Sequence, residues 1–354
     1  MPVFIGGIVL NDEVKNILLV RIDRIGDVIL SLPMLPLLKR RYPNASISVL
    51  MRKYTRELVE QHSCVDEVLV YEHEDSVQSL WAILREIRKR HFDIAIIPYP
   101  RFRPALILFF AGIRIRVGSG YRWYSFLFNR RVFEHRKDAK RHEAEYNINL
   151  LRPLGIEPGA EPEFEFSIPQ SACDRVDSLL AVDSVRVEDK FIILHPGSGG
   201  SSRDWSGKNF SKLGNEVERR LGMKVIVTGG KGEEQLVQEI TAGMTGSPLA
   251  IVAKFSLTEL GALIRRAKVF ISNSTGPMHI AAIVGTPVVA FFPPIVQCSP
   301  VRWGPYTRKK RIFLADDKTC PLCKGSPCRS NVCMDQITVS EVFFAIKELL
   351  DEQH

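Results

Sequence analysis

The turn at residues 273–276 has the residue types that open a helix towards a bound anion. It follows an apolar run of strand length and supplies hydroxyls from Ser274 and Thr275. Pro277 comes after Gly276, and proline suits the first helical position because it has no amide hydrogen to lose. Free amides and the positive end of the helix dipole can bind phosphate at such a start. The turn predicts a phosphate-binding helix start or, alternatively, an ordinary strand-to-helix corner.

The loop at residues 195–205, HPGSGGSSRDW, combines backbone freedom with donors for a phosphate. Ser198 offers a hydroxyl, and Arg203 offers a fixed positive charge. The chain lacks the Gly-x-Gly-x-x-Gly spacing of dinucleotide sites, a Walker phosphate loop and any Asp-x-Asp pair for a divalent metal. A nicotinamide or flavin dinucleotide is therefore not expected, and a bound diphosphate must be neutralised by protein groups.

Two further loops offer groups for the rest of a nucleotide. Residues 228–234 place Glu233 and Glu234 at a helix start, where a carboxylate can cap amides or accept from ribose hydroxyls. Residues 256–259 have the spacing of a capping box, and Phe255 before them could stack on a base. All four loops follow strands, and doubly wound sheets bind ligands at the carboxyl ends of their strands.

The elements that carry these loops alternate between apolar strands and helical stretches. Such alternation predicts parallel sheets with both faces covered, and hence an α/β fold. A Pro-rich passage at residues 154–169 marks the boundary between two expected domains, 1–165 and 166–354. Strands are expected at residues 17–22, 47–51, 65–71 and 93–99, then at 191–195, 224–228, 250–252, 269–272 and 287–292. Helices are expected at 28–43 and 76–90 and at the C-terminal end, after a Cys-rich segment at 320–333.

Composition is that of a globular protein, with 354 residues, 45% hydrophobic and 25% charged. No apolar run reaches the roughly 20 residues of a membrane span. The first residues have no basic region of the kind that begins a signal peptide. A cytoplasmic protein is expected.

Residues 101–141 concentrate positive charge. They hold eleven basic residues and two acidic ones, a net charge of +9 in a chain whose total is +8. Aromatic residues such as Trp123 and Phe126 lie among them. This mixture suits nucleic acid, an anionic membrane surface or a phosphorylated amphiphile. The alternative is a solvated basic face with aromatic residues in the core behind it.

Four of the seven cysteines lie close together, at Cys320, Cys323, Cys328 and Cys333. In a cytoplasmic protein such a cluster is typical of a metal site, and four thiolates suit tetrahedral zinc. The spacing after the first pair differs from that of standard zinc fingers. The cluster therefore predicts a structural zinc site or, alternatively, free thiols or an occasional disulfide.

The three motifs ILLVRIDRIGDVILSLPML, HPGSGGSSRDW and SNSTGPMHIAAIVGTPVVAFFPP, in this order, resemble glycosyltransferase family 9, the ADP-heptose:lipopolysaccharide heptosyltransferases. The resemblance covers most of the chain. It implies a GT-B architecture, in which two Rossmann-like domains face a central cleft. The acceptor is expected on the N-terminal domain and the nucleotide sugar on the C-terminal domain. Transfer is expected to need no metal and no cofactor, in line with the missing Asp-x-Asp pair.

The resemblance also implies roles for residues of the first domain. Asp27 falls on the family's catalytic aspartate and is the expected base. Asp23 is the rival carboxylate, although it could instead form an ion pair with Arg21 or Arg24. Arg21 matches a basic residue on the acceptor side, and Arg24 and His142 are further candidates for acceptor binding.

On the donor side, the resemblance places Arg203 at the diphosphate and Phe255 near the adenine. Glu233 matches the residue at the ribose, with Glu234 as the alternative. Many members have aspartate where this chain has Ser274, and a neutral hydroxyl binds a sugar less strongly than a carboxylate. The expected donor-binding residues are Ser198, Arg203, Glu233, Phe255, Ser274, Thr275 and Gly276.

These expectations describe an inverting, metal-independent glycosyltransferase that moves heptose from ADP-heptose to the inner core of lipopolysaccharide. Its expected partners are the nucleotide sugar, a phosphorylated lipid-linked oligosaccharide and the anionic inner face of the inner membrane, without nucleic acid. His195 and His279 are expected to be hydrogen-bonded residues rather than bases. One alternative is a sugar-nucleotide 2-epimerase of GT-B-like fold, which would use the same nucleotide site without an acceptor. Another is a nucleic-acid-binding protein that uses residues 101–141, which leaves the second half unexplained.

Overall fold

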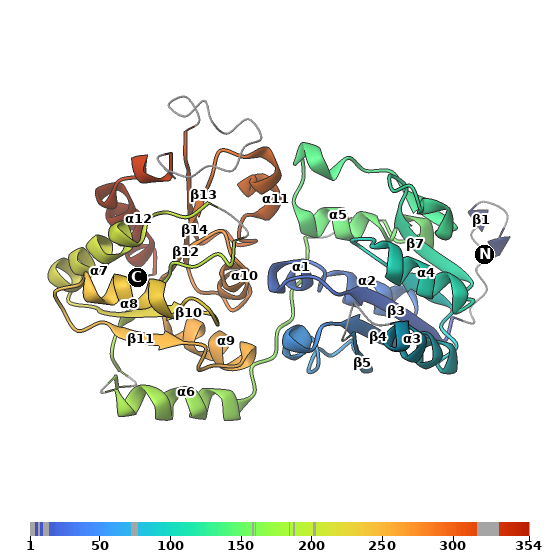
Figure 1. Ribbon diagram of the computed structural model, residues 1–354, viewed down its shortest axis with the longest axis horizontal. Coiled ribbons are helices and arrows are strands. Elements are labelled where there is room, and N and C mark those ends of the chain that lie inside the picture. The colour runs from blue at the N-terminus through green and yellow to red at the C-terminus, as the bar shows by residue number, and fades with distance from the viewer. Residues whose placement is uncertain are drawn as a thin grey trace. The chain divides into compact units, whose positions relative to one another are not determined.

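The computed structural model describes residues 4–5, 8–9, 14–71, 77–157, 159, 161–183, 185–186, 188–200, 203–316 and 333–353. The chain forms two compact units, drawn from blue to green and from green to red in Figure 1. The first comprises Met1–Arg136 and Arg141–Ser167, and the second comprises Lys137–Lys140 and Ile168–His354. The sequence places the boundary between residues 165 and 166.

The first unit is built on a six-stranded parallel sheet with the order β5-β4-β3-β6-β7-β8. Its central strand is a continuous apolar run that is buried on both faces, as expected for a parallel sheet covered by helices. The strands are β3 (Asn16–Arg21), β4 (Ser46–Met51), β5 (Glu67–Val70), β6 (Ile94–Ile96), β7 (Ile115–Ser119) and β8 (Arg130–Val132). A separate antiparallel pair consists of β1 (Phe4–Ile5) and β2 (Ile8–Val9).

The helices of the first unit lie on both faces of this sheet (Figure 1). They are α1 (Ile25–Ile29), α2 (Met34–Arg41), α3 (Val77–Lys89), α4 (Phe102–Phe110) and α5 (Glu143–Asn149). Short 3₁₀ turns are η1 (Lys53–Leu58), η2 (Ser125–Leu127), η3 (Arg136–Asp138) and η4 (Arg152–Leu154). The single helix predicted at residues 28–43 is wrong. It is divided at Pro33, which precedes α2, because proline has no amide hydrogen to continue the helix before it.

The second unit repeats the plan, with six parallel strands in the order β11-β10-β9-β12-β13-β14. The strands are β9 (Phe191–His195), β10 (Lys224–Gly229), β11 (Leu249–Val252), β12 (Phe270–Asn273), β13 (Val288–Phe292) and β14 (Lys310–Leu314). The helices are α6 (Gln170–Val182), α7 (Gly207–Leu221), α8 (Glu234–Ala242), α9 (Leu257–Arg266), α10 (Gly276–Ile283), α11 (Pro300–Trp303) and α12 (Val339–Asp351). Two 3₁₀ turns are η5 (Val296–Cys298) and η7 (Met334–Gln336).

Both sheets have the strand order 3-2-1-4-5-6 when each is counted from its own first long strand. This order reverses between β3 and β6 in the first unit and between β9 and β12 in the second. In doubly wound sheets, ligands bind beyond the carboxyl ends of the strands at this point of reversal. The loops after these four strands are therefore where a site is expected. Among the helices that the structure describes, none is long and apolar enough to cross a bilayer.

Candidate functional site

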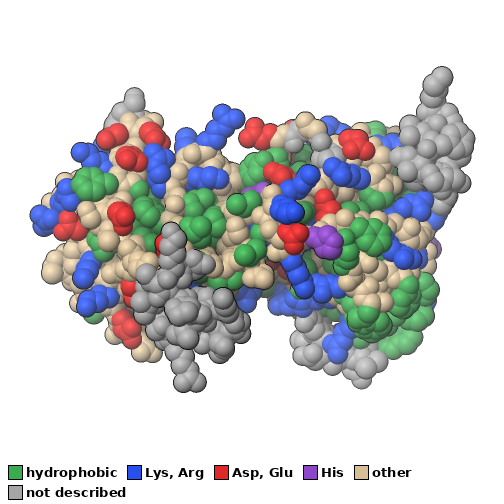
Figure 2. Space-filling view, turned by 90° about the horizontal axis from the view of Figure 1, so that it is seen from above, with side chains coloured by type: hydrophobic (Ala, Val, Ile, Leu, Met, Phe, Trp, Pro, Cys, Tyr) green, Lys and Arg blue, Asp and Glu red, His purple; other side chains and the backbone are tan. Residues whose placement is uncertain are grey.

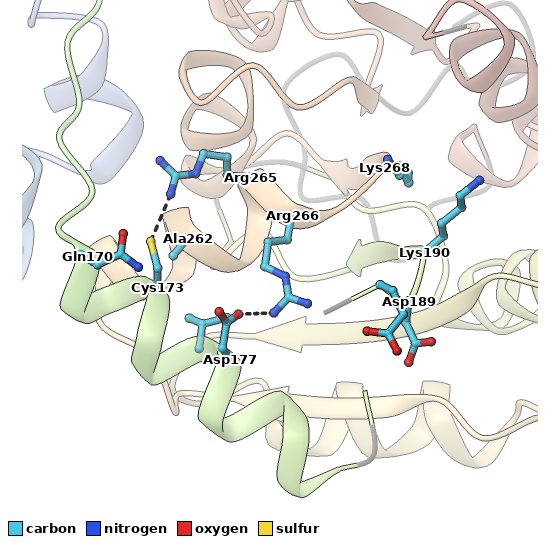
Figure 3. A pocket seen from close by; sticks show the side chains of 11 residues that line it. Gln170, Cys173, Asp177, Asp189, Lys190, Ala262, Arg265, Arg266 and Lys268 are labelled. Carbon is cyan, nitrogen blue, oxygen red and sulfur yellow. Dashed lines mark hydrogen bonds and ion pairs between the residues drawn. The ribbon is translucent and has the colours of Figure 1, made fainter. Parts of the chain in front are cut away.

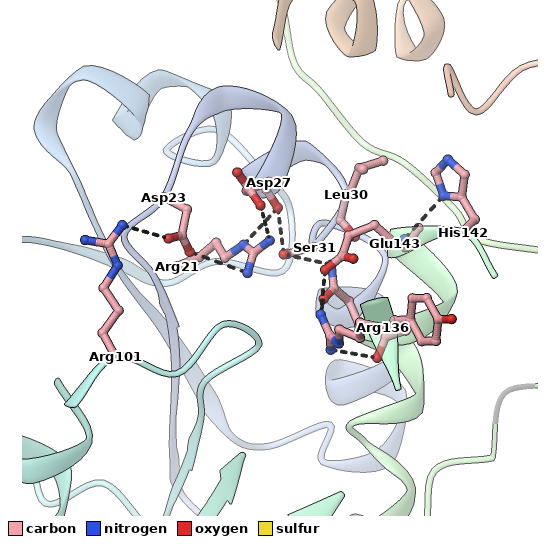
Figure 4. A network of polar contacts seen from close by, with 12 residues as sticks. Arg21, Asp23, Asp27, Leu30, Ser31, Arg101, Arg136, His142 and Glu143 are labelled. Atoms are coloured by element: carbon pink, nitrogen blue, oxygen red, sulfur yellow. Dashed lines mark hydrogen bonds and ion pairs between the residues drawn. The ribbon is translucent and has the colours of Figure 1, made fainter. Parts of the chain in front are cut away.

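The last residue of β3 is a buried arginine, Arg21, which lies between two aspartates: Asp23 in the loop that follows and Asp27 in α1 (Figure 4). Arg21 is 1% exposed. Its Nη2 donates to Asp27 Oδ1 at 2.9 Å, and its Nε donates to the backbone carbonyl of Asp27 at 2.9 Å. Its Nη1 lies 3.4 Å from Asp23 Oδ2. Arg21, expected on the acceptor side, therefore directs its guanidinium to the carboxylates of Asp23 and Asp27, which follow it closely in the chain.

The two aspartates differ in access to solvent. The Asp23 side chain is 8% exposed and lies between Arg21 and Arg101, whose Nη2 is 3.4 Å from Asp23 Oδ1. Burial raises the pKa of Asp23, while the positive charge of Arg21 opposes that rise. The Asp27 side chain is 23% exposed. Of the two carboxylates, Asp27 is thus the one that an acceptor hydroxyl can reach more readily.

Helix α5 fixes the short helix α1 that carries Asp27. Ser31 Oγ donates to the Asp27 carbonyl at 2.8 Å, and Asn147 Nδ2 donates to the Leu30 carbonyl at 2.9 Å. His142 caps α5, and its Nδ1 accepts from the backbone amide of Ala144. The structure therefore brings His142 onto an element that packs against the Asp27 loop (Figure 4).

Arg24 is the residue that precedes α1, the helix that carries Asp27, and its side chain makes no capping hydrogen bond. Its side chain is exposed. The described residues near the carboxyl end of β3 therefore include an accessible carboxylate at Asp27, an exposed cation at Arg24, a partly exposed cation at Arg101, and a histidine at His142. Such a set can accept a proton from a hydroxyl and can attract an anionic acceptor.

In the second unit, Glu233 joins the loops that follow β9 and β10. Its Oε2 accepts from the Gly230 amide at 2.7 Å, and its Oε1 accepts from the Gly199 amide at 3.3 Å. A side chain at Gly197 would meet this carboxylate, because an added Cβ would lie 1.9 Å from Glu233 Oε1. Glu234 is instead the first residue of α8. Of the two alternatives, Glu233 is the one that contacts the β9 loop.

The loop after β9 is also fastened to the end of β12. The Trp205 amide donates to Asn273 Oδ1 at 2.8 Å, and Asn273 Nδ2 donates to the Pro196 carbonyl at 2.6 Å. Trp205 itself is buried, and its Nε1 donates to the Ile337 carbonyl at 2.9 Å. This anchoring brings the loop that carries Ser198 and Arg203 next to the turn at residues 274–276.

The turn after β12 starts α10 in the predicted way, with one difference. Thr275 is the residue that precedes the helix, and its side chain makes no capping hydrogen bond. Gly276 takes the first helical position, so Pro277 takes the second rather than the first. Ser274, Thr275 and Gly276 are all half-buried. The polar start of α10 is therefore available for a ligand.

The predicted capping box at the start of α9 is confirmed. Ser256 Oγ accepts from the Glu259 amide at 3.3 Å, and Glu259 Oε2 accepts from the Ser256 amide at 2.8 Å. Phe255, the residue before the box, is half-buried. It lies between β11 and α9 in the chain, so the donor-side residues all follow carboxyl ends of strands of one sheet.

The sequence reasoning missed Asp204, which lies between Arg203 and Trp205. Burial raises the pKa of Asp204 to about 6, while a hydrogen bond from Ser198 opposes that rise. His195 is a second buried group here, and its Nδ1 lies 2.9 Å from Thr228 Oγ1. Burial lowers the pKa of His195 to about 4, so this histidine is neutral at physiological pH. No pattern in the sequence distinguishes Asp204 from an exposed loop aspartate.

Most of the predicted cysteine cluster lies outside the residues that the structure describes. Cys320, Cys323 and Cys328 lie outside the described residues, and Cys333 is buried in the core of the second unit. The zinc site stays a prediction.

A cavity of about 440 Å³ lies elsewhere in the second unit, between α6 and α9 (Figure 3). Its lining includes Lys190 and Lys268, which precede β9 and β12, so the cavity is at the amino ends of these strands. Several of its charged groups already have partners: Arg266 pairs with Asp177, and Arg265 Nη2 donates to Cys173 Sγ at 3.1 Å. This is the opposite edge of the sheet from the loops described above.

The chain is similar to known proteins of one family. Residues 80–333 match glycosyltransferase family 9 (heptosyltransferase). The chain is 25% identical to lipopolysaccharide heptosyltransferase 3 of Escherichia coli K12, over 92% of this chain and 96% of that protein. It is similar to the crystal structure of a family 9 glycosyl transferase from Veillonella parvula, with a TM-score of 0.83 and 25% identity over 96% and 97% of the two chains.

The fold is also that of E. coli ADP-heptose lipopolysaccharide heptosyltransferase II, with a TM-score of 0.78 and 22% identity over 96% of this chain and 99% of that one. These similarities and the two six-stranded parallel sheets confirm the predicted fold class, with two Rossmann-like units as in GT-B enzymes. The family match covers well over half of the chain. The protein is therefore an enzyme of the glycosyltransferase class and belongs to glycosyltransferase family 9.

Proposed function

We propose that the protein is an inverting glycosyltransferase that moves heptose from ADP-heptose to the inner core of lipopolysaccharide without a catalytic metal. The observation that carries this proposal is the similarity to lipopolysaccharide heptosyltransferases along about nine-tenths of the chain. The arrangement of the two sets of loops supports it, because one offers a base and the other offers groups for a nucleotide diphosphate. Neither the 2-epimerase nor the nucleic-acid-binding alternative gains a supporting observation.

In this mechanism Asp27 is the base. An inverting transfer needs one group to take the proton of the acceptor hydroxyl while that oxygen attacks the anomeric carbon. The bond from this carbon to the diphosphate breaks in the same step. Arg21 is a positioning residue, because its Nη2 holds one carboxylate oxygen of Asp27 and its Nε holds the Asp27 backbone carbonyl. The other carboxylate oxygen is left for the acceptor.

The departing diphosphate gains negative charge, so the donor site must stabilise it. Arg203, the Ser198 hydroxyl and the start of α10 at residues 274–276 are the groups proposed for this task. Glu233 would accept hydrogen bonds from the ribose, and Phe255 would stack on the adenine. Ser274 would bind a hydroxyl of the donor sugar. No metal is required in this arrangement, because protein groups supply the positive charge.

Replacing Arg203 by alanine should weaken binding of ADP-heptose by about 1.5–3 kcal/mol, the usual contribution of a hydrogen bond to a charged group. Arg203→Lys should restore part of this loss, since a point charge survives without the bidentate fork. Isothermal titration of each variant measures the effect. Arg219→Ala, which removes an exposed arginine on α7, is the matched control. Unchanged affinity in Arg203→Ala would place the diphosphate elsewhere.

We propose that the basic and aromatic segment at residues 101–141 meets the anionic inner face of the inner membrane and the phosphorylated lipid-linked acceptor. Several of its aromatic side chains are largely exposed, with Trp123 at 73% and Phe126 at 62%. Phe102 packs against Trp123, with ring centroids 4.9 Å apart, and the Arg122 guanidinium lies over Tyr99. Figure 2 shows basic and hydrophobic side chains next to one another on the surface of the first unit. Exposed aromatic and basic groups together suit a lipid interface.

Reversing two exposed charges in this segment, with Arg122→Glu and Arg131→Glu, should weaken binding to vesicles of anionic lipid and raise the KM for lipid-linked acceptor. Donor affinity should stay the same. Arg85→Glu with Lys89→Glu on α3 makes the same change of charge at exposed positions outside the segment and is the control. High salt should have a similar effect, because charges are screened beyond about 10 Å at 0.1 M. Acceptor kinetics that respond neither to salt nor to the reversal would show that the segment is an ordinary solvated surface.

The proposed reaction is tested by incubating the protein with ADP-heptose and a panel of truncated core lipopolysaccharides, with and without EDTA. The expected result is ADP release that depends on the acceptor, with one heptosyl group added to one of the truncated cores. EDTA should leave the rate unchanged. Consumption of ADP-heptose without any acceptor would instead indicate an epimerase.

A further inference from the structure

Asp204 occupies an unusual place for a carboxyl group. It stands between Arg203 and the buried Trp205 in the loop that is fastened to the end of β12 by Asn273. Its side chain receives a hydrogen bond from Ser198, and the negative charge of Glu233 acts on it. Ser198 and Arg203 are both residues proposed to hold the donor diphosphate. Asp204 therefore adds a negative charge where the site must receive an anion.

The two carboxyl groups of this site are not equally able to stay charged. Glu233 accepts from two backbone amides, those of Gly199 and Gly230, and such donors stabilise a negative charge. Asp204 Oδ1 is buried, and none of the described residues donates a hydrogen bond to it. Burial raises the pKa of Asp204 to about 6 even in the free protein. If one of the two groups is to take a proton, it is Asp204.

Among the described residues, two further groups near this loop have shifted pKa values, and neither changes charge near neutral pH. Burial lowers the pKa of His195 to about 4, so the imidazole is neutral. Burial raises the pKa of the Cys298 thiol, although Arg203 and Arg302 oppose the rise, so the thiol stays protonated. A proton exchanged by this loop near pH 6–7 thus belongs to Asp204.

We infer that Asp204 takes up one proton from solvent when the donor binds, so that the carboxylate becomes a neutral carboxylic acid beside the diphosphate. This inference rests on the proposed function, because it assumes that the donor carries a diphosphate to this loop. The reason is electrostatic. A diphosphate bound to this loop would repel a carboxylate of the same loop, and the bound state avoids the repulsion by protonating the less stabilised group.

This proton uptake makes the affinity for the donor depend on pH. The bound protein holds the proton more tightly than the free protein, so donor binding is favoured at low pH and weakens as the pH rises above 6. The Kd should rise by up to about tenfold per pH unit there, because one proton is coupled to one binding event. At pH 7, the uptake should lie between about half and one proton per donor bound.

The test is isothermal titration of the full chain with ADP-heptose, whose diphosphate diester does not titrate near neutrality. Measurements at pH 7 in two buffers with different ionisation enthalpies give the number of protons taken up. In Asp204→Asn, which keeps the shape of the side chain, the uptake should vanish and the Kd should lose its dependence on pH. Asp335→Asn changes an exposed aspartate of the same unit and should behave like the unchanged protein.

Ser198→Ala gives a second readout that needs no change at Asp204. It removes the hydrogen bond that favours the Asp204 carboxylate, so the midpoint of the pH dependence should move to higher pH. Binding of ADP-heptose without proton uptake, and with a flat pH profile, would overturn the inference and leave the proposed function standing. Absence of ADP-heptose binding at every pH would overturn the proposed function itself.

Discussion

Replacing Asp27 by asparagine should lower turnover by a factor on the order of 10²–10⁴, the usual contribution of a general base. The carboxamide keeps the shape of the side chain and can still accept from Arg21 through its oxygen, but it cannot take the acceptor proton. The affinity for ADP-heptose should hardly change, because the donor is proposed to bind to the second unit. Steady-state rates with a saturating acceptor and donor titrations on the same protein separate these two effects.

Asp23→Asn is the matched control for this experiment. Asp23 lies two residues after Arg21, but its side chain is almost completely buried between Arg21 and Arg101. Its replacement should cost stability rather than the chemical step. Near-normal turnover in Asp27→Asn together with an inactive but folded Asp23→Asn would assign the base to Asp23.

Arg21→Met should lower the free energy of unfolding by about 3–5 kcal/mol, as expected when one partner of a buried ion pair is removed and the other is left uncompensated. Here two carboxylates, Asp23 and Asp27, lose their shared cation. Turnover should also fall, because Asp27 loses the two hydrogen bonds that orient it. Urea unfolding measures the first effect, and kcat in the folded fraction measures the second.

Two further measurements on Arg21 variants concern the pH dependence of stability and the comparison of stability with kcat. Folding raises the pKa of Asp23. At pH values between the ordinary pKa of an aspartate and this raised pKa, the folded protein therefore binds more protons than the unfolded protein. Stability is therefore lost as the pH rises through this range, and the loss should be larger in Arg21→Met, which lacks the opposing charge. Arg21→Lys should recover stability better than kcat, since lysine supplies charge without the two-pronged contact. Equal recovery of both would argue against a positioning role.

Much of the sheet could be predicted from apolar runs alone. The strand at residues 191–195 has the predicted bounds, and the other predicted strands overlap those of the structure. Strands β7, β8 and β14 were not predicted, because arginine or lysine interrupts their apolar pattern. Each of these strands is specified by pairing with a neighbouring strand. The local sequence carries no information about that pairing.

The candidate site could also be predicted only in part from local sequence patterns. The polar loops after β9, β10 and β12 could be recognised because glycine, serine and a helix-capping residue leave a local signal. The contacts that join these loops could not be recognised from the sequence, because the partners lie far apart in the chain. Glu233 accepts from Gly199, and Asn273 accepts from Trp205. Arg101 lies beside Asp23 for the same reason, because β3 and β6 are neighbours in the sheet although they are far apart in the chain.

We propose that heptose is transferred in a single displacement, with Asp27 as the base and the ADP diphosphate leaving from the opposite face of the sugar. The most direct test is the anomeric configuration of the product, measured by NMR on the heptosylated core formed from ADP-heptose. A single displacement predicts a new bond with the configuration opposite to that of the donor. A product that keeps the configuration of the donor would rule out a single displacement, because retention requires a second displacement that Asp27 alone does not provide.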